Sequence, residues 1–188
     1  MMKELVFCLE EPSAEAMLQG LLPKIFPHSN VAIRYITFDG KQDLEKQLLR
    51  KLRNYQNPFA KFIVLRDQDS YSDCKVLKAK LLNICVAAGK TNAMVRIACR
   101  ELETYYLADL AAVELGLQIT GLVKSQAKKK FRSPDYLGSP SKELTVLTNG
   151  QYQKVGGSRA IGPHLDIDNT RSDSFRNLVS GIKKIIID

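Results

Sequence analysis

Residues 62–74 read FIVLRDQDSYSDC, in which an apolar run leads directly into three aspartates. A short, wholly apolar run such as FIVL is typical of a strand in the middle of a parallel sheet, where both faces are buried. We expect three further strands, at residues 4–9, 31–38 and 93–99, and helices that begin near Ser13, Gly40, Ser72 and Arg100. Since parallel neighbours need a crossover between them, this alternation predicts an α/β fold with a mainly parallel sheet of about four strands and flanking helices.

The residue composition of the chain changes near residue 118. We assign residues 1–118 to a core domain and residues 119–188 to a loop-rich, basic extension whose last helix, over 172–188, packs back on the core. Between Ile119 and Pro163 the chain has eight Lys or Arg against two acids, which is +6 of its net charge of +8. Such a patch indicates a polyanionic partner, although an exposed basic loop is the alternative. The residues expected to contact nucleic acid are Lys124, Lys128, Lys129, Lys130, Arg132 and Arg159.

Several classes of protein are not expected. No apolar run approaches the ~18 residues of a membrane span, and the N-terminus lacks the layout of a signal peptide, so we expect a cytoplasmic protein without membrane contact. Cys8, Cys74, Cys85 and Cys99 form no C-x-x-C pair, and only His28 and His164 could join them. We therefore expect free, buried thiols rather than a zinc site.

Acidic residues follow every predicted strand. In an open α/β sheet, ligands bind beyond the carboxyl ends of the strands, so these positions matter for function. An acid there also serves as a helix N-cap, and we assign Asp39 and, behind Ser72, Asp73 to that role. The remaining acids at these positions are Glu10, Glu11 and Glu15 after the first strand, Asp67 and Asp69 after the third, and Glu101 and Glu103 after the fourth.

Paired carboxylates at one sheet edge repel each other unless a cation lies between them. Oxygen ligands without His or Cys favour Mg²⁺ or Mn²⁺. In an extended turn Asp67 and Asp69 would point the same way, toward one cation. Glu15 lies one helical turn after Glu11 and could face the same ion. The spacing thus predicts a divalent-metal site.

The segments EPSAE (11–15) and LRDQDS (65–70) resemble a Toprim domain, the topoisomerase-primase fold shared with nucleases of the overcoming-lysogenization-defect family. Together with RELETYYLADL (100–110), they are similar to a prokaryotic family of unknown function with a Toprim-like core, often encoded beside ATPases in anti-phage defence loci. The resemblance implies that Glu11 is a general acid or base and a metal ligand, and that Asp67 and Asp69 are the principal ligands. It also implies a supporting ligand at Glu15 and a second-ion ligand at Glu101.

One position departs from the Toprim pattern, which has glycine directly after its glutamate. That position is Pro12 if Glu11 is the match, and Glu11 if Glu10 is, so either glutamate could be the catalytic one. Lys154, in the glycine-flanked segment GQYQKVGGSRA (150–160), could place a positive charge on the scissile phosphate. The alternative for Lys154 is a solvated loop lysine.

These features favour a Mg²⁺- or Mn²⁺-dependent nuclease acting on DNA or RNA. The resemblance further implies that it is the effector of an anti-phage system with an ATPase partner of the AAA or ABC type. A catalytically silent adaptor that binds an ATPase or nucleic acid is a second hypothesis, and a phosphohydrolase acting on a small nucleotide is a third. The apolar end KKIIID (183–188) leaves room for a homodimer.

Overall fold

The computed structural model describes residues 3–27 and 30–187, with side chains as far as residue 185. His28, and the last side chains of the segment considered for a homodimer, lie outside these residues. No helix in the described ranges is both long enough and apolar enough to cross a bilayer. The four cysteines are free; Cys8 and Cys85 are buried, and Cys74 and Cys99 are half-buried.

Four parallel strands form the sheet, which confirms the predicted α/β fold. They are β1 (Lys3–Leu9), β2 (Val31–Thr37), β3 (Lys61–Asp67) and β4 (Met94–Ala98), in the spatial order β2-β1-β3-β4. In the register, Leu9 of β1 lies opposite Leu65 of β3, and Asp67 lies opposite Ala98 of β4. The carboxyl ends of β1, β3 and β4 therefore meet at one edge, and the two central strands carry acids there.

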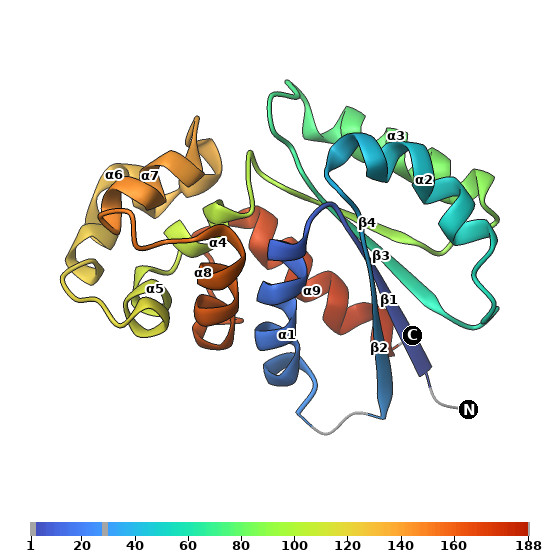
Figure 1. The fold of residues 1–188 in the computed structure, drawn as a ribbon, viewed down its shortest axis with the longest axis horizontal. Helices are drawn as coiled ribbons and strands as arrows, with labels where there is room; N and C mark the ends of the chain where they lie inside the picture. The colour runs from blue at the N-terminus through green and yellow to red at the C-terminus, as the bar shows by residue number, and fades with distance from the viewer. Residues whose placement is uncertain (1–2, 28–29, 188) are drawn as a thin grey trace.

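Helices cover both faces of the sheet (Figure 1). On one face, α2 (Lys41–Arg53) and α3 (Cys74–Ala87) pack on Val6, Cys8 and Val64; on the other, α1 (Pro12–Ile25) and α9 (Asp173–Ile187) pack on Phe7 and Leu65. The strands are apolar on both sides because alternate residues point to opposite faces. This alternation also decides on which side each acid at the strand ends lies.

Short helices connect β4 to α9 and lie beside the sheet (Figure 1). They are α4 (Glu103–Leu107), α5 (Leu110–Leu117), α6 (Lys129–Arg132), α7 (Pro140–Leu147) and α8 (Lys154–Ile161), with 3₁₀ turns η1 (Val123–Ala127), η2 (Pro134–Tyr136) and η3 (Gly162–His164). The prediction of one amphipathic helix from residue 100 is wrong, because Asp109 breaks it. Its carboxylate caps α5 by accepting a hydrogen bond from the backbone N–H of Ala112 at 3.1 Å, and the whole of α4 is buried.

Of the two predicted helix caps, one differs in the structure and one is confirmed. Asp39 is exposed and is not the cap; Gly40, with φ of 88°, is the N-cap of α2, and the N–H of Asp39 donates to Asp43 instead. Asp73 caps α3, as predicted, and its carboxylate accepts from the N–H of Lys75 at 2.7 Å. Ser72 precedes that cap and does not fill it.

Close contacts between backbones hold α8 against α1. A Cβ atom added to Gly162, just after α8, would lie 2.5 Å from the carbonyl oxygen of Met17 in α1. One added to Gly116 of α5 would lie 2.7 Å from the carbonyl oxygen of Ala160. Because only glycine permits such approaches, these positions hold the end of α8, whose first residue is Lys154, close against α1 and α5.

Candidate active site

The strand ends divide the acids between the two faces of the sheet. Arg66 points toward α2, where its Nη1 donates to Glu45 Oε1 at 2.6 Å, so Asp67, the next residue, points to the opposite side. Glu10 follows β1 and contacts the end of β3. Its Oε2 accepts from the backbone N–H of Asp67 at 3.1 Å and lies 3.7 Å from Arg66 Nε. Glu10 therefore joins the ends of β1 and β3.

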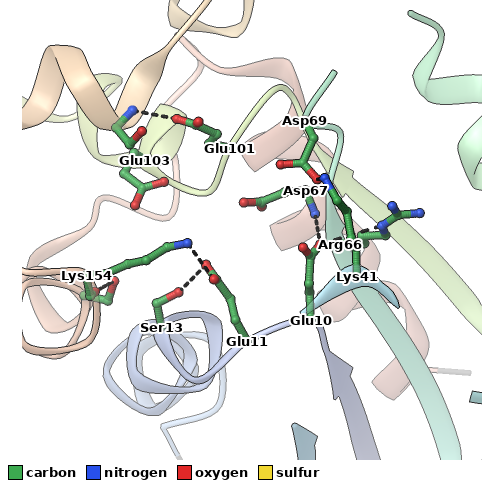
Figure 2. Close-up of polar contacts among 12 residues, drawn as sticks. Glu10, Glu11, Ser13, Lys41, Arg66, Asp67, Asp69, Glu101, Glu103 and Lys154 are labelled. Carbon is green, nitrogen blue, oxygen red and sulfur yellow. Dashed lines mark hydrogen bonds and ion pairs between the residues drawn. The ribbon is translucent and has the colours of Figure 1, made fainter. Parts of the chain in front are cut away.

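Asp67 is a buried carboxyl among other carboxyls. Burial raises its pKa well above the ordinary value, and the negative charges of Glu10, Glu103 and Glu11 raise it further. A hydrogen bond from the backbone of Leu102 lowers the pKa but does not offset these effects. Figure 2 shows the side chains of Asp67, Glu11 and Glu103 directed toward a common space. Such a concentration of negative charge is costly and is typical of a functional site.

Lys154 reaches Glu11 across this space. Its Nζ lies 2.5 Å from Glu11 Oε2, and the other carboxylate oxygen of Glu11 accepts from Ser13 Oγ at 2.7 Å (Figure 2). Burial by itself lowers the pKa of Lys154, but the bond to Glu11 and the charges of Glu103 and Asp67 more than offset it, so the pKa is raised. Lys154 therefore stays a cation at neutral pH and faces three carboxylates.

Glu103, which follows the fourth strand together with Glu101, is a site residue to which the sequence assigns no role. It is 1% exposed; its Oε1 accepts from the hydroxyl of Tyr152 at 2.9 Å, and its Oε2 is buried without a hydrogen-bond partner. Burial raises its pKa. The signal in the sequence is the aromatic-rich stretch TYYL that follows Glu103 directly. A glutamate at the start of a wholly buried helix needs either a partner or a ligand.

Asp69 pairs with a lysine at the start of α2. The expected extended turn is wrong, because Asp69 has a φ of 53°, in the left-handed region. This conformation turns its carboxylate toward α2, where Oδ2 lies 3.0 Å from Lys41 Nζ (Figure 2). Asp67 and Asp69 therefore do not point the same way, and Asp69 is paired with a lysine.

Glu15 and Glu101 are directed to other partners. Glu15 Oε2 accepts from Thr37 Oγ1, at the end of β2, at 2.6 Å, and its Oε1 accepts from Gln19. Glu101 Oε2 accepts at 2.6 Å from the backbone N–H of Ser141 in the first turn of α7. Glu101 thus ties the end of β4 to the extension.

The basic residues predicted to bind nucleic acid are all exposed. Most of them lie in or beside η1 and α6, whereas Arg159 lies on α8. Lys130 pairs with Glu143 of α7 at 2.6 Å, and the buried ring of Phe131 anchors α6 between these lysines. The extension therefore presents a cluster of positive side chains on a fixed element.

The donor set suits a hard divalent cation. As they stand, no three Asp, Glu, His or Cys side chains of the described residues converge closely enough to surround one ion. Even so, the residues at the common space fit such an ion by their chemistry: they offer carboxylate oxygens, one of which, Glu103 Oε2, is buried without a partner. Oxygen donors of this kind favour Mg²⁺ or Mn²⁺.

A family model described as "Domain of unknown function (DUF4276)" matches residues 9–183, a range that contains every residue of this site. The chain belongs to this DUF4276 family. Among curated proteins, none matches this DUF4276 chain. Its fold is similar to that of the C-terminal region of the Burkholderia pseudomallei OLD protein, with a TM-score of 0.54 and 13% identity over 97% of this chain and 98% of that one. The likeness shows the fold, a Rossmann-like α/β arrangement in which helices flank a sheet of four parallel strands.

Proposed function

We propose that this protein is a divalent-metal-dependent nuclease that hydrolyses phosphodiester bonds in DNA or RNA. The observation that carries the proposal is the grouping of Asp67, Glu11 and Glu103 with the cationic Lys154 at the carboxyl edge of a Toprim-type sheet. The similarity in fold to the OLD protein's C-terminal region supports a nuclease-related role. The ATPase partner and the anti-phage role are predictions that rest on the sequence resemblance.

Asp67, Glu11 and Glu103 would hold Mg²⁺ or Mn²⁺ in this proposal. When bound, the ion supplies a more acidic water and neutralises charge on the attacked phosphate. Lys154 stays protonated, so it binds a phosphate oxygen and stabilises the charge that develops there. Asp69 is held by Lys41 through Oδ2, so it is not counted among these ligands.

The geometry favours Glu11 over Glu10 as the catalytic glutamate. Glu10 already accepts from the backbone of Asp67 and lies beside Arg66. Glu11 lies at the N-cap of α1, and its carboxylate is oriented by Ser13 and Lys154. Glu11 makes no such contact between the strand ends. It can exchange a proton with a substrate oxygen, or with a water, that displaces Lys154.

The test is a cleavage assay on plasmid, single-stranded DNA and RNA with Mg²⁺, Mn²⁺ or a chelator. Wild type should cleave at least one substrate only with metal, and Asp67→Asn and Lys154→Met should both lose activity. Asp73→Asn is the matched control, since Asp73 caps α3 and asparagine caps equally well. Cleavage that survives the chelator or the Asp67→Asn change would refute the proposal.

One observation favours the adaptor alternative. Lys154 neutralises Glu11 directly, so the carboxylates have a cation of their own in the protein. An adaptor would need no metal, and its fold should bind Mn²⁺ weakly. Measurement of Mn²⁺ affinity therefore separates the two functions even if the nuclease requires a partner for activity.

A further inference from the structure

Tyr136 is the most exposed large hydrophobic side chain among the described residues. It is 87% exposed and lies in η2, between α6 and α7. Single exposed apolar side chains are common on protein surfaces. Tyr136 is distinguished by its surroundings, because it lines two separate hollows whose other walls carry positive side chains.

The first hollow, of about 740 Å³, lies over α6. Lys129, Lys130 and Arg132 line it together with Tyr136 and Leu137. Its volume is within the range of ~300–1,000 Å³ that holds small ligands or parts of larger ones. It combines an aromatic face and an aliphatic side chain with three cations, which suits a base and its phosphates.

The second hollow, of about 610 Å³, lies between Tyr136, α3 and β4. Lys75 and Lys78 of α3 and Arg96 of β4 line it, as does Cys99, directly after β4. Two acids also line it: Asp173, which pairs with Arg176 at 2.7 Å, and Asp135. Since Ala98 at the end of β4 lies opposite Asp67, this hollow approaches the edge of the sheet that carries the site.

The backbone that carries Tyr136 is held firmly. The carboxylate of Asp135 accepts from Ser172 Oγ at 2.6 Å and from the backbone N–H of Ser174 at 2.9 Å, which ties η2 to the start of α9. Phe131 is buried, and its carbonyl oxygen accepts from Gln126 Nε2 at 2.7 Å. A ring that is exposed on a fixed backbone loses little conformational freedom when a ligand stacks on it.

We propose that Tyr136 is a stacking platform for an unpaired nucleobase. Lys129 and Arg132 on one side, and Lys75 and Lys78 on the other, hold the phosphates of a single-stranded segment that crosses the ring toward the carboxyl edge of the sheet. This inference rests on the proposed nuclease function and narrows its substrate to nucleic acid with single-stranded character. Bases within a duplex are already stacked and paired, so they cannot offer a face to Tyr136, whereas every unpaired base can.

The test is binding measured by fluorescence anisotropy in a chelator, which prevents cleavage. The probes are a labelled single-stranded oligonucleotide, an abasic strand of equal length and a blunt duplex. Stacking of one base contributes ~1–3 kcal/mol, so Tyr136→Ala should weaken binding of the single strand by ~5- to 150-fold. The same change should leave the abasic strand unaffected, and Tyr136→Phe should bind as wild type does.

Phe59→Ala is the matched control, because Phe59 is also an exposed aromatic residue, at 64%, but lies just before the amino end of β3. It should not change binding. Since the chain has no tryptophan, Tyr136→Trp provides a single tryptophan, which can be excited selectively over the tyrosines and whose emission should be quenched by the single strand and not by the duplex.

Equal loss of affinity for intact and abasic strands in Tyr136→Ala, or no loss for either, would overturn the platform. If Tyr136→Ala gives either of these binding results while wild type still cleaves in the presence of metal, the stacking inference is refuted and the proposed nuclease function is not. If wild type neither binds nor cleaves any of the probes, the proposed function fails and the inference fails with it.

Discussion

Replacing Gly157 by alanine tests how α8 is held in the site. A Cβ atom at Gly157 would lie 2.6 Å from Cε2 of the Tyr152 ring, and closer still to Cδ2. Carbon atoms pack at ~3.5–4.0 Å, so the ring or the helix must move by about 1 Å. Overpacking of this kind costs ~1–3 kcal/mol of the free energy of unfolding.

The neighbouring glycine provides the control. A Cβ at Gly156 meets nothing within 4 Å, and Gly156 lies in the same helix. Gly156→Ala should therefore stabilise the protein by ~0.4–1 kcal/mol, through the lower entropy of the unfolded chain. Gly157→Ala has the same entropic stabilisation, but overpacking against the Tyr152 ring opposes it. Urea unfolding should place Gly157→Ala ~1–3 kcal/mol below Gly156→Ala.

The displacement should also reach the site, since the hydroxyl of Tyr152 donates to Glu103. Gly157→Ala should therefore bind Mn²⁺ more weakly than Gly156→Ala. Equal stability of the two variants would refute the inference that close packing of α8 positions Tyr152 and Lys154.

Three further substitutions test the charges of the site and its support. Asp67→Asn should raise the free energy of unfolding by ~0.5–2 kcal/mol in a chelator, as removal of a costly functional group often does. Folding raises the pKa of Asp67 above its ordinary value of 3.8, so ionisation of Asp67 opposes folding. The stability of Asp67→Asn relative to wild type should therefore grow as the pH rises from acid to neutral. A stability difference that does not change with pH would contradict this. Glu45→Gln should lower stability by ~1–3 kcal/mol because it removes a partner of the buried Arg66. Glu143→Gln, which breaks the exposed pair with Lys130, should cost at most ~1 kcal/mol, and equal losses in these two variants would show that burial of Arg66 is unimportant.

The fold and one half of the site could be predicted from local sequence. Apolar runs separated by helical patterns indicate the order of strands along the chain, and a parallel sheet places the residues after β1, β3 and β4 at one edge. Asp67 follows from this reasoning because it is the last residue of its strand. Glu11 and Glu10 follow too, although only the alternation of side chains about the strand ends separates their roles.

The remaining features depend on contacts that are distant in sequence or on single backbone angles. The glycine-flanked segment indicates Lys154 as a phosphate-binding candidate, but no local pattern indicates that α8 would pack against α1 and pair Lys154 with Glu11, 143 residues away. The direction of Asp69 depends on its positive φ. The choice between Glu101 and Glu103 depends on the position of α7, whose first turn takes up the carboxylate of Glu101.

Calorimetric titration with Mn²⁺ tests the central claim most directly, because it detects the metal site whether or not a partner controls cleavage. Wild type and Asp73→Asn should show saturable binding of equal affinity, and Asp67→Asn should lose at least ~10-fold in affinity. Bound Mn²⁺ should also stabilise wild type, by ~2.7 kcal/mol at a hundredfold excess over the dissociation constant. Equal Mn²⁺ affinity in wild type and Asp67→Asn would contradict a metal site built on Asp67.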